Sequence, residues 1–393
     1  MISTIRTLSK TFKKDLFCFK KKTYSTEATF ETQPFRLHKL EKGPDTTSKL
    51  TKEDALIYYK KLLTIRRMEN ACSTLYKEKV IRGFCHLYSG QEAVAVGMIA
   101  SLRKDKDTVV TSYRAHGWAY LMGIPVLEVI AELTGRKTGN VRGKGGSMHM
   151  YTTNFFGGNG IVGGQVPLGG GLGFTHKYRK DGGVCACLYG DGAANQGQLF
   201  EIYNISQLWK LPIIFICENN GYGMGTSAER AAASTEYYTR GDYVPGVWVD
   251  GMDFFSVREA TKFAIEHCSS GKGPIVMEVA TYRYFGHSMS DPGTSYRSRD
   301  EVKKVRETRD PIAGFKEKII KANLVSPDDL KKIDDKVKNE IEEAVQKSKT
   351  DPEVPEKELT FDIYSNCLEP EIRNNHSFSP LKHERLGKLL VQQ

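Results

Sequence analysis

A strand–helix–strand pattern between residues 183 and 220 decides the fold class of the chain. Residues 183–189 (GVCACLY) and 212–217 (PIIFIC) are short apolar runs of the kind that form buried strands, and residues 195–210 carry apolar side chains at helical spacing. A right-handed crossover makes two such strands parallel. Similar alternation extends over about residues 80–290. We therefore predict an α/β fold with a mostly parallel sheet and helices on both faces.

Two short polar motifs stand where the two strands end. Asp191, in Gly-Asp-Gly, follows the first strand, and Asn220, in Asn-Asn, follows the second, 29 positions later. The carboxyl ends of parallel strands are where such sheets bind ligands. Mg²⁺ prefers oxygen ligands and usually shares its coordination shell with phosphates. Suitable oxygens here are the Asp191 carboxylate, the Asn220 amide oxygen and the backbone carbonyl of Tyr222. A helix is expected to begin just after Gly192, and the amide groups at its N-terminus favour binding of a diphosphate. The alternative is a glycine turn without a metal.

Two helices outside this unit can be predicted from their capping residues. Thr51 is the expected N-cap of a helix running to about Lys79. Ser326 is the expected N-cap of a helix from Pro327 to about Lys347, with Asp329 at the capping-box position. An apolar stripe indicates that the second helix packs on a core; it consists of Leu330, Ile333, Val337, Ile341 and Ala344.

The net charge of +10 is concentrated at the start of the chain. Residues 1–26 hold seven basic residues and one acid, which gives 7 − 1 = +6 and leaves about +4 for the rest. This segment is also rich in Ser and Thr with interspersed apolar residues, which is typical of a mitochondrial transit peptide; the alternative is a basic arm of another kind. Because a transit peptide is removed, its charge does not indicate a nucleic-acid partner. No apolar run is long enough to span a bilayer, so no membrane partner is expected.

Three other patterns suggest chemistry that the residues alone do not support. The eight cysteines contain no CxxC pair, so we expect reduced, buried thiols rather than zinc ligands. Residues 158–163 satisfy GxGxxG, but no clear strand is predicted before them and Asp181 falls in a polar turn. We therefore expect close contact with a diphosphate rather than a dinucleotide. The segment GKGGSMHM (143–150) is expected to be a mobile glycine loop without a catalytic role.

Several long strings make the chain recognisable. GDGAANQGQ followed by CENNGYGMGTS resembles the thiamine-diphosphate-dependent 2-oxo-acid dehydrogenase family, and specifically the alpha subunits of its pyruvate branch. The resemblance runs from about Phe84 to Tyr364 and includes SYRAHG (112–117), GKGGSMHMY (143–151) and GHSMSDPGTSYR (286–297). It implies a three-layer fold and two cofactors, thiamine diphosphate and Mg²⁺.

The resemblance also assigns site residues. Asp191, Asn220 and the backbone of Tyr222 match magnesium ligands. The positions that match the surroundings of the diphosphate are Arg114, Gly160, Val162, Gly192, Ala193 and Arg283. The residues that match the cofactor's reactive end are His86, Tyr113 and His287, with both histidines as catalytic candidates. The chemistry agrees in part, since arginines pair well with phosphates and a histidine moves protons near neutral pH.

The activity implied by the resemblance is oxidative decarboxylation of pyruvate with reductive acetylation of lipoamide in the mitochondrial matrix, feeding acetyl-CoA production. The implied partners are a beta subunit, in a tetramer of two alpha and two beta chains, and a dihydrolipoyl acetyltransferase core with lipoyl domains. About 320 residues remain without leader and tail, enough for one α/β unit, so the beta subunit is expected to complete the site. The alternatives are a branched-chain 2-oxo-acid dehydrogenase, an inactive scaffold subunit and an NAD-binding oxidoreductase.

Regulation and segment boundaries complete these expectations. Ser288, Ser295 and Ser227 match serines that a dedicated kinase phosphorylates in relatives and a phosphatase restores; the alternative is that they are plain loop serines. Relatives usually carry His at Phe285 and a bulkier residue at Gly221. The expected segments are a leader (1–26), an N-terminal extension (27–50), the cofactor domain (51–350) and a C-terminal extension (351–393). The tail after about Arg373 matches nothing.

Overall fold

The computed structural model describes residues 24–366, 368–372 and 381–384. Most of the predicted leader, as well as Cys18 and Cys367, lies outside the described residues. Within them, none of the helices combines the length and apolar character needed to cross a bilayer. The helices are α1 (Lys52–Lys77), α2 (Glu92–Ile99), α3 (His116–Leu121), α4 (Val126–Leu133), α5 (Gln165–Arg179), α6 (Gly197–Leu208), α7 (Ala228–Ala231), α8 (Phe254–Ser269), α9 (Arg299–Arg309), α10 (Pro311–Lys321) and α11 (Pro327–Thr350).

A seven-stranded sheet forms the centre of the fold, in the order β2-β10-β11-β7-β6-β4-β5. All neighbouring strands are parallel except β2, which runs antiparallel to β10 at one edge. The predicted α/β class with a mostly parallel sheet is confirmed. The strands of this sheet are β2 (Arg36–His38), β4 (Thr108–Ser112), β5 (Phe155–Asn159), β6 (Cys185–Gly190), β7 (Ile213–Asn219), β10 (Gly246–Asp250) and β11 (Ile275–Ala280).

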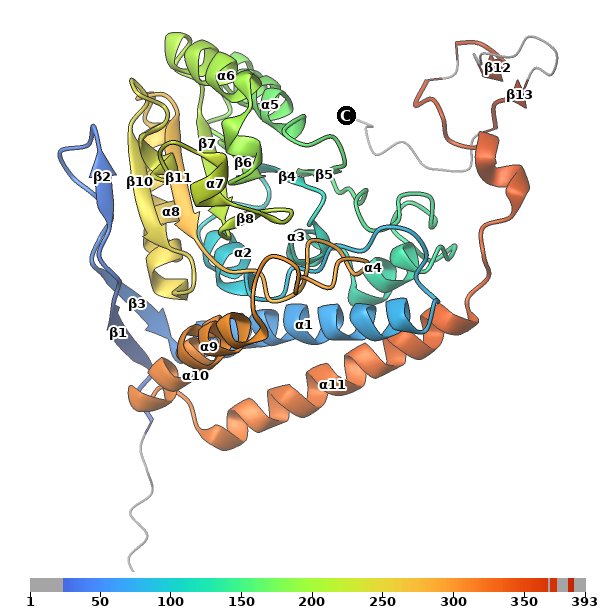
Figure 1. Cartoon of the computed structure of the whole chain (residues 1–393), viewed down its shortest axis with the longest axis horizontal. Coiled ribbons are helices and arrows are strands. Elements are labelled where there is room, and N and C mark those ends of the chain that lie inside the picture. The colour runs from blue at the N-terminus through green and yellow to red at the C-terminus, as the bar shows by residue number, and fades with distance from the viewer. Residues whose placement is uncertain (1–23, 367, 373–380, 385–393) are drawn as a thin grey trace, which may run out of the picture.

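Helices cover both faces of this sheet, as predicted (Figure 1). Successive side chains of a strand point to opposite faces. On β6, Cys187 therefore belongs to the apolar cluster under α5 and α6, whereas Leu188 belongs to the larger cluster under α2 and α8. The same alternation on β7 places Phe215 on one face and Ile216 on the other. Both faces of these strands are buried, which explains why their sequences are continuous apolar runs.

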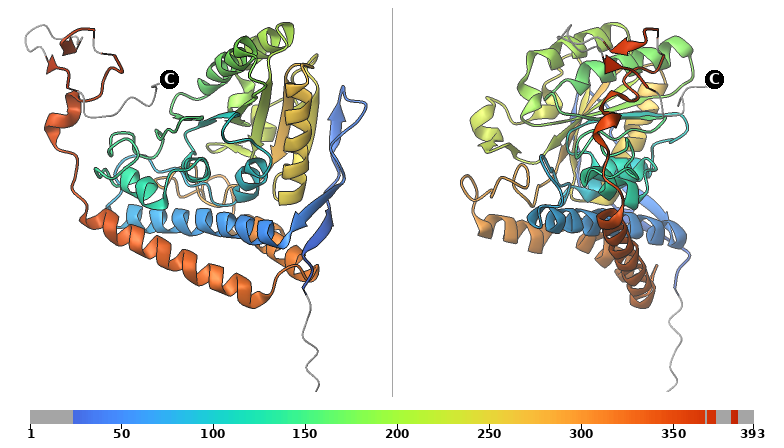
Figure 2. Two further views of the ribbon diagram at one scale, coloured as in Figure 1. Left: turned by 180° about the vertical axis from the view of Figure 1, so that it is seen from behind. Right: turned by 90° about the vertical axis from the view of Figure 1, so that its right-hand side faces the viewer.

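Two long helices lie side by side below the sheet (Figures 1 and 2). The Thr51 side chain accepts a hydrogen bond from the Asp54 amide at the start of α1, so the predicted N-cap is confirmed. Ser326 and Asp329 form the predicted capping box of α11, which extends to Thr350. Leu330, Val337, Ile341 and Ala344 of the expected stripe are buried, and Ile333 is partly buried against the same core.

A small antiparallel sheet at the N-terminal end was not predicted. β1 (Glu27–Glu31) pairs with β3 (Thr47–Thr51), with Phe30 opposite Ser48. Phe30 is buried and stacks on Phe255 of α8, with ring centroids 4.2 Å apart. Two further antiparallel pairs are β8 (Tyr222–Gly223) with β9 (Thr226–Ser227), and β12 (Glu371–Ile372) with β13 (Leu381–Lys382). The expected N-terminal extension therefore contributes to the core.

Residues that follow α11 contact the segment directly before the glycine loop. The buried Glu358 carboxylate accepts hydrogen bonds from the Arg142 guanidinium at 3.0 and 2.8 Å. Asp351 accepts from the Thr138 amide at 2.9 Å. The first part of the expected C-terminal extension thus joins α11 to the loop that precedes β5.

A buried histidine lies on α8, far along the helix from its N-terminus. His267 is 8% exposed, and its Nε2 has no hydrogen-bond partner. Burial, together with the charges of Lys272 and Lys210, lowers the pKa of His267 from 6.5 to about 4. Protonation of this imidazole is therefore favoured in the unfolded chain between these two pH values.

We expect this histidine to contribute to acid destabilisation. The native state holds the imidazole neutral, so stability is fully present above pH 6.5 and is lost as the pH falls through 4. At pH 5 the loss is about 2 kcal/mol. His267→Gln, which has no titrating group, should lose less stability than the wild-type chain between pH 7.5 and 5. Denaturant midpoints measured at both pH values test this, and parallel losses in the two proteins would refute it.

Candidate active site

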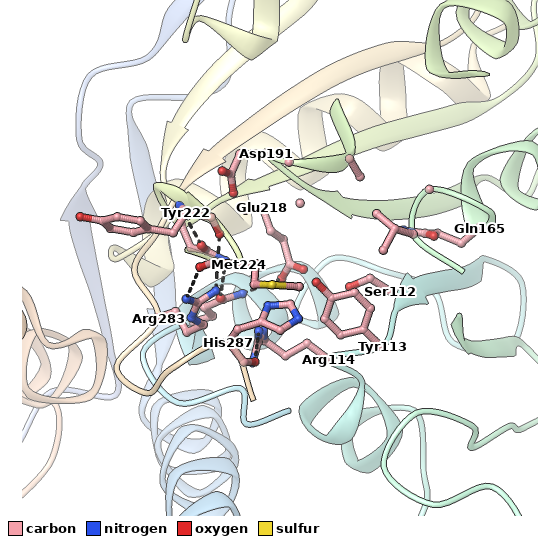
Figure 3. A pocket seen from close by; sticks show the side chains of 18 residues that line it. Ser112, Tyr113, Arg114, Gln165, Asp191, Glu218, Tyr222, Met224, Arg283 and His287 are labelled. Carbon is pink, nitrogen blue, oxygen red and sulfur yellow. Dashed lines mark hydrogen bonds between the residues drawn. The ribbon is translucent and has the colours of Figure 1, made fainter. Parts of the chain in front are cut away.

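The two polar motifs meet at one edge of the sheet. Gly190 at the end of β6 pairs in register with Glu218 of β7, so Asp191 and Asn220 leave adjacent strands at the same end. Both line a cavity of about 260 Å³ (Figure 3). Two details differ from the sequence prediction. β7 continues through Asn219, and a 3₁₀ turn at Ala193–Asn195 separates Gly192 from α6, which begins at Gly197.

Asp191 is one of two buried acidic residues that line this cavity, the other being Glu218. The Asp191 side chain is 2% exposed, and its Oδ2 atom has no hydrogen-bond partner. Burial raises the pKa of the Asp191 carboxyl to about 6. Nearby, the Asn220 Oδ1 accepts from the Tyr222 amide at 3.3 Å, while its Nδ2 donates to Gln91 at 3.2 Å. An unpartnered buried carboxylate is costly unless a cation or donor meets it, so these oxygens fit a divalent ion.

Two buried arginines, Arg114 and Arg283, give the cavity positive charge, and Arg283 also lies 3.4 Å from the Tyr222 carbonyl oxygen. Arg114 donates to the backbone oxygens of Leu87 at 2.6 Å and His287 at 3.0 Å. Arg283 donates to the backbone oxygen of Met224 and to the hydroxyl of Tyr296. Within the described residues, neither guanidinium has a carboxylate in ion-pair contact. Burial lowers the pKa of both, that of Arg283 to about 10. Two such cations beside one cavity fit a polyanion such as a diphosphate.

Three rings cluster at the side of the cavity. His86 lies 4.6 Å from Tyr113 and 5.3 Å from His287 between ring centroids, and Tyr113 lies 5.4 Å from His287. Burial, followed by the charge of Arg114, lowers the pKa of His86 to about 2 and that of His287 to about 4. Both imidazoles are therefore neutral near pH 7. Among the described residues, no group hydrogen-bonds to Nδ1 of either imidazole, and His287 is the one of the two that lines the cavity.

The remaining predicted residues are divided between the cavity wall and its surroundings. Val162, Gly192 and Ala193 line the cavity together with Tyr113, Arg114, Asp191, Asn220, Tyr222, Arg283 and His287. His86 stands behind this wall against Tyr113 and His287. Gly160 is exposed, and Met148 and His149 are its nearest side chains. The structure thus gathers the predicted site residues around one cavity, with Gly160 and His86 outside its lining.

The expectation that no strand lies at the GxGxxG segment was wrong. A strand does precede the third glycine of GxGxxG, because β5 (Phe155–Asn159) contains Gly158 and α5 follows at Gln165. The sequence FFGGN hides this strand, since two of its five residues are glycine. Gly158 is needed for close approach: a Cβ there would lie 2.3 Å from the Met148 backbone oxygen. Asp181 does lie in a turn, as predicted, and not at the end of a strand. It follows α5 and accepts a hydrogen bond from the Gly183 amide at 2.7 Å.

Sequence reasoning missed several polar groups in the cavity. Glu218 is buried, accepts a hydrogen bond from the Tyr88 hydroxyl and lies 3.4 Å from the Gln91 amide nitrogen. Burial raises the pKa of Glu218 to about 7. Gln165, Ser112 and the side chain of Met224 also line the cavity. The signal for Glu218 was its position directly before Asn219-Asn220, where a charged residue interrupts an apolar strand.

The loop that carries two of the predicted phosphorylation sites lies beside this cavity. Asp291 accepts hydrogen bonds from the His287 amide at 2.6 Å and from the Tyr296 hydroxyl at 2.6 Å. Ser288 is 8% exposed, with its Oγ 2.8 Å from Ser290, and Ser295 is exposed. The third site, Ser227, accepts from the Arg230 amide as the N-cap of α7. Phosphorylation of these three serines stays a prediction.

The two departures from relatives have different surroundings. Gly221 has φ +84°, with open space where a Cβ would lie. Phe285 is partly buried against the main apolar cluster. Neither residue lines the cavity.

Comparison with known proteins agrees with this geometry. A family model described as "Dehydrogenase E1 component" matches residues 60–357. The chain is 62% identical over 349 residues to the "Probable pyruvate dehydrogenase E1 component subunit alpha, mitochondrial" of Caenorhabditis elegans, covering 89% of this chain and 88% of that protein. It is 62% identical to the type II alpha subunit of Ascaris suum, covering 89% of each chain. It is 56% identical over 361 residues to the somatic-form alpha subunit of Homo sapiens, covering 92% of each.

Proposed function

The chain belongs to the dehydrogenase E1 component family, and from this premise we propose that it is the alpha subunit of a mitochondrial pyruvate dehydrogenase. The reaction is oxidative decarboxylation of pyruvate with reductive acetylation of lipoamide. The family depends on thiamine diphosphate, and the alpha subunit works in a complex with a beta subunit. The observation that carries the proposal is one cavity lined by a buried carboxylate, Asp191, and by two buried guanidinium groups; among the described residues Asp191 Oδ2 has no hydrogen-bond partner and neither arginine has an ion-pair partner.

The metal ligands and the arginines of the cavity then have separate roles. Asp191, Asn220 and the Tyr222 carbonyl would hold Mg²⁺, and Arg114 and Arg283 would hold the diphosphate. When bound, thiamine diphosphate supplies the electron sink for decarboxylation. The chain supplies binding, orientation and a fixed electrostatic environment.

The neutral histidines are suited to a different task. Because His86 and His287 are uncharged near pH 7, each can donate or accept a proton at Nδ1 without carrying a permanent charge beside the arginines. The Tyr113 ring contacts both imidazoles. We assign these three residues to the reacting end of the cofactor and the arginines to its diphosphate end.

The mitochondrial location and the assembly follow from the same proposal. Residues 1–26 serve as the transit peptide. The assembly is a tetramer of two alpha and two beta chains, which passes the acetyl group to lipoyl domains of a dihydrolipoyl acetyltransferase core. A regulatory kinase and phosphatase act on Ser288, Ser295 and Ser227.

Calorimetry combined with turnover tests this proposal. We expect tight, magnesium-dependent binding of thiamine diphosphate to the chain assembled with a matched beta subunit, and weak binding to either chain alone. The assembled complex should decarboxylate pyruvate in preference to a branched-chain 2-oxo acid. Binding without any turnover would support the scaffold alternative, and preference for the branched acid would move the chain to the other branch of the family.

A further inference from the structure

A buried hydrogen-bond relay lies behind the ring cluster. The Glu69 carboxylate on α1 is 2.9 Å from Nδ1 of His116, the first residue of α3, and His116 Nε2 is 2.8 Å from the Ser147 hydroxyl. Glu69 and His116 are 0% exposed and Ser147 is 5% exposed. The polarity of the relay follows from its ends: the imidazole donates to Glu69 through Nδ1 and accepts from Ser147 at Nε2.

The relay holds the backbone of the segment that carries His86. The His86 amide donates to the Ser147 Oγ at 3.2 Å, and the Tyr88 amide donates to Glu69 at 2.8 Å. The carbonyl between them, that of Leu87, accepts from Arg114 at 2.6 Å. Three consecutive residues are thus fixed by three buried side chains that come from distant parts of the chain.

The glycine loop supplies Ser147 at this point. The buried Glu132 carboxylate of α4 accepts hydrogen bonds from the amides of Gly145 at 2.6 Å and Gly146 at 3.2 Å. It also accepts from the amides of Val141 and Gly143, each at 2.9 Å. The segment that we expected to be a mobile loop therefore has a rigid attachment directly before Ser147.

The order Ser–His–Glu matches the connectivity of an acyl-transfer triad, but the surroundings indicate another role. The Ser147 oxygen already accepts a hydrogen bond from a backbone amide, the side chain is buried, and it is not part of the cavity wall. No substrate can reach such a hydroxyl as a nucleophile. The hydrogen bonds instead hold the His86 backbone in a fixed position relative to α1 and α3.

We propose that Ser147 is a positioning residue, which with His116 and Glu69 fixes the His86 ring for the reaction. This inference rests on the proposed function only for the effect on turnover. In the part of the chain that the structure describes, His86 Nδ1 has no hydrogen-bond partner, so no hydrogen bond at that atom sets the orientation of the ring. A small displacement of a reacting group lowers turnover strongly. The proposed ligands of Mg²⁺ and diphosphate lie on other segments, and Arg114 contacts the positioned segment only at the Leu87 carbonyl, so we expect cofactor binding to change much less than turnover.

The test compares Ser147→Ala, Ser147→Thr and a control in the complex with a matched beta subunit. The control is Ser206→Ala, which removes a buried hydroxyl that has no hydrogen-bond partner on α6. We expect Ser147→Ala to lower kcat by about 10- to 100-fold. The dissociation constant of thiamine diphosphate with Mg²⁺ should change by less than about threefold, because the hydrogen bond between Arg114 and the Leu87 carbonyl does not involve Ser147. Ser147→Thr keeps the hydroxyl and should restore most of the rate, and Ser206→Ala should match the wild-type complex.

Amide exchange provides a measurement that does not depend on activity. In the cofactor-free complex, Ser147→Ala should speed hydrogen exchange in the peptide that spans residues 85–91, and Ser206→Ala should not. Unchanged kcat and exchange in Ser147→Ala would overturn the inference, as would a loss in Ser147→Thr equal to that in Ser147→Ala. A wild-type complex that fails to decarboxylate pyruvate would instead count against the proposed function. Hydrogen exchange in residues 85–91 would then be the test of whether Ser147 positions this segment.

Discussion

Asp191→Asn is expected to weaken magnesium-dependent binding of thiamine diphosphate to the assembled complex by more than about 100-fold, since the loss of an outer-shell partner alone typically costs about 10- to 100-fold. The substitution keeps the shape of the side chain and removes the charge of the one carboxylate, among the residues that the structure describes, that has a buried oxygen without a hydrogen-bond partner. Turnover of pyruvate should fall in parallel. Calorimetry at fixed Mg²⁺ concentration measures the affinity directly.

The cofactor-free chain should respond to the same substitution in the opposite direction. Burial raises the pKa of Asp191 from 3.8 to about 6, so the fold favours the protonated carboxyl. This contribution to stability is complete below pH 4 and is lost as the pH rises through 6. Asparagine cannot ionise, and at pH 8 it should therefore raise the free energy of unfolding by about 2–3 kcal/mol. The two proteins should be equally stable near pH 4.

This pair of opposite effects separates a ligand site from a structural carboxylate. Asp105→Asn, at an exposed position remote from the cavity, serves as the matched control and should change neither affinity nor stability. If Asp191→Asn instead destabilised the cofactor-free chain and left magnesium-dependent affinity intact, Asp191 would be a structural residue and the proposed metal site would be wrong.

The part of the site that sequence reasoning located well is the part encoded locally. The runs GVCACLY and PIIFIC are buried on both faces, so they are apolar throughout, and Asp191 and Asn220 follow them directly. A short crossover then places both residues at the same edge without further information. By contrast, Arg114 and Arg283 reach the cavity after β4 and β11, and only family resemblance, not spacing, connected them to it.

The elements that were missed have a physical reason in common. β1 and β3 bury one side chain in two, and their outward residues are Thr, Glu and Lys, so only Phe30 and Leu50 give an apolar signal. β5 contains two glycines, which lack the side chains that mark a strand. The relay of Glu69, His116 and Ser147 was invisible for another reason. Its members are polar residues from three separate segments, and their burial depends on packing that no local pattern encodes.

A second buried polar network should dominate stability. Arg66 of α1 donates to Glu92 of α2 at 3.0 Å and to Asp310 at 2.9 Å. Glu92 is 0% exposed and also accepts from the Gly90 amide at 2.9 Å. Asp310 in turn caps α10 and accepts from the Tyr284 hydroxyl at 3.1 Å. The network thus joins α1, α2 and α10 to the segment that carries Arg283.

Arg66→Met is therefore expected to lower the free energy of unfolding by about 3–5 kcal/mol, because it leaves a fully buried carboxylate without its counter-ion. Adding Glu92→Gln to this variant should recover part of the loss, since glutamine removes the charge and still accepts from the Gly90 amide. Lys303→Met is the matched control: Lys303 and Glu307 are exposed and 3.8 Å apart, so its loss should cost less than about 1 kcal/mol. Denaturant midpoints of the four proteins decide the matter. Equal losses for Arg66→Met and Lys303→Met would mean that the buried network contributes no more than a surface pair. A double variant that is less stable than Arg66→Met alone would mean that the buried charge of Glu92 stabilises the fold even without Arg66.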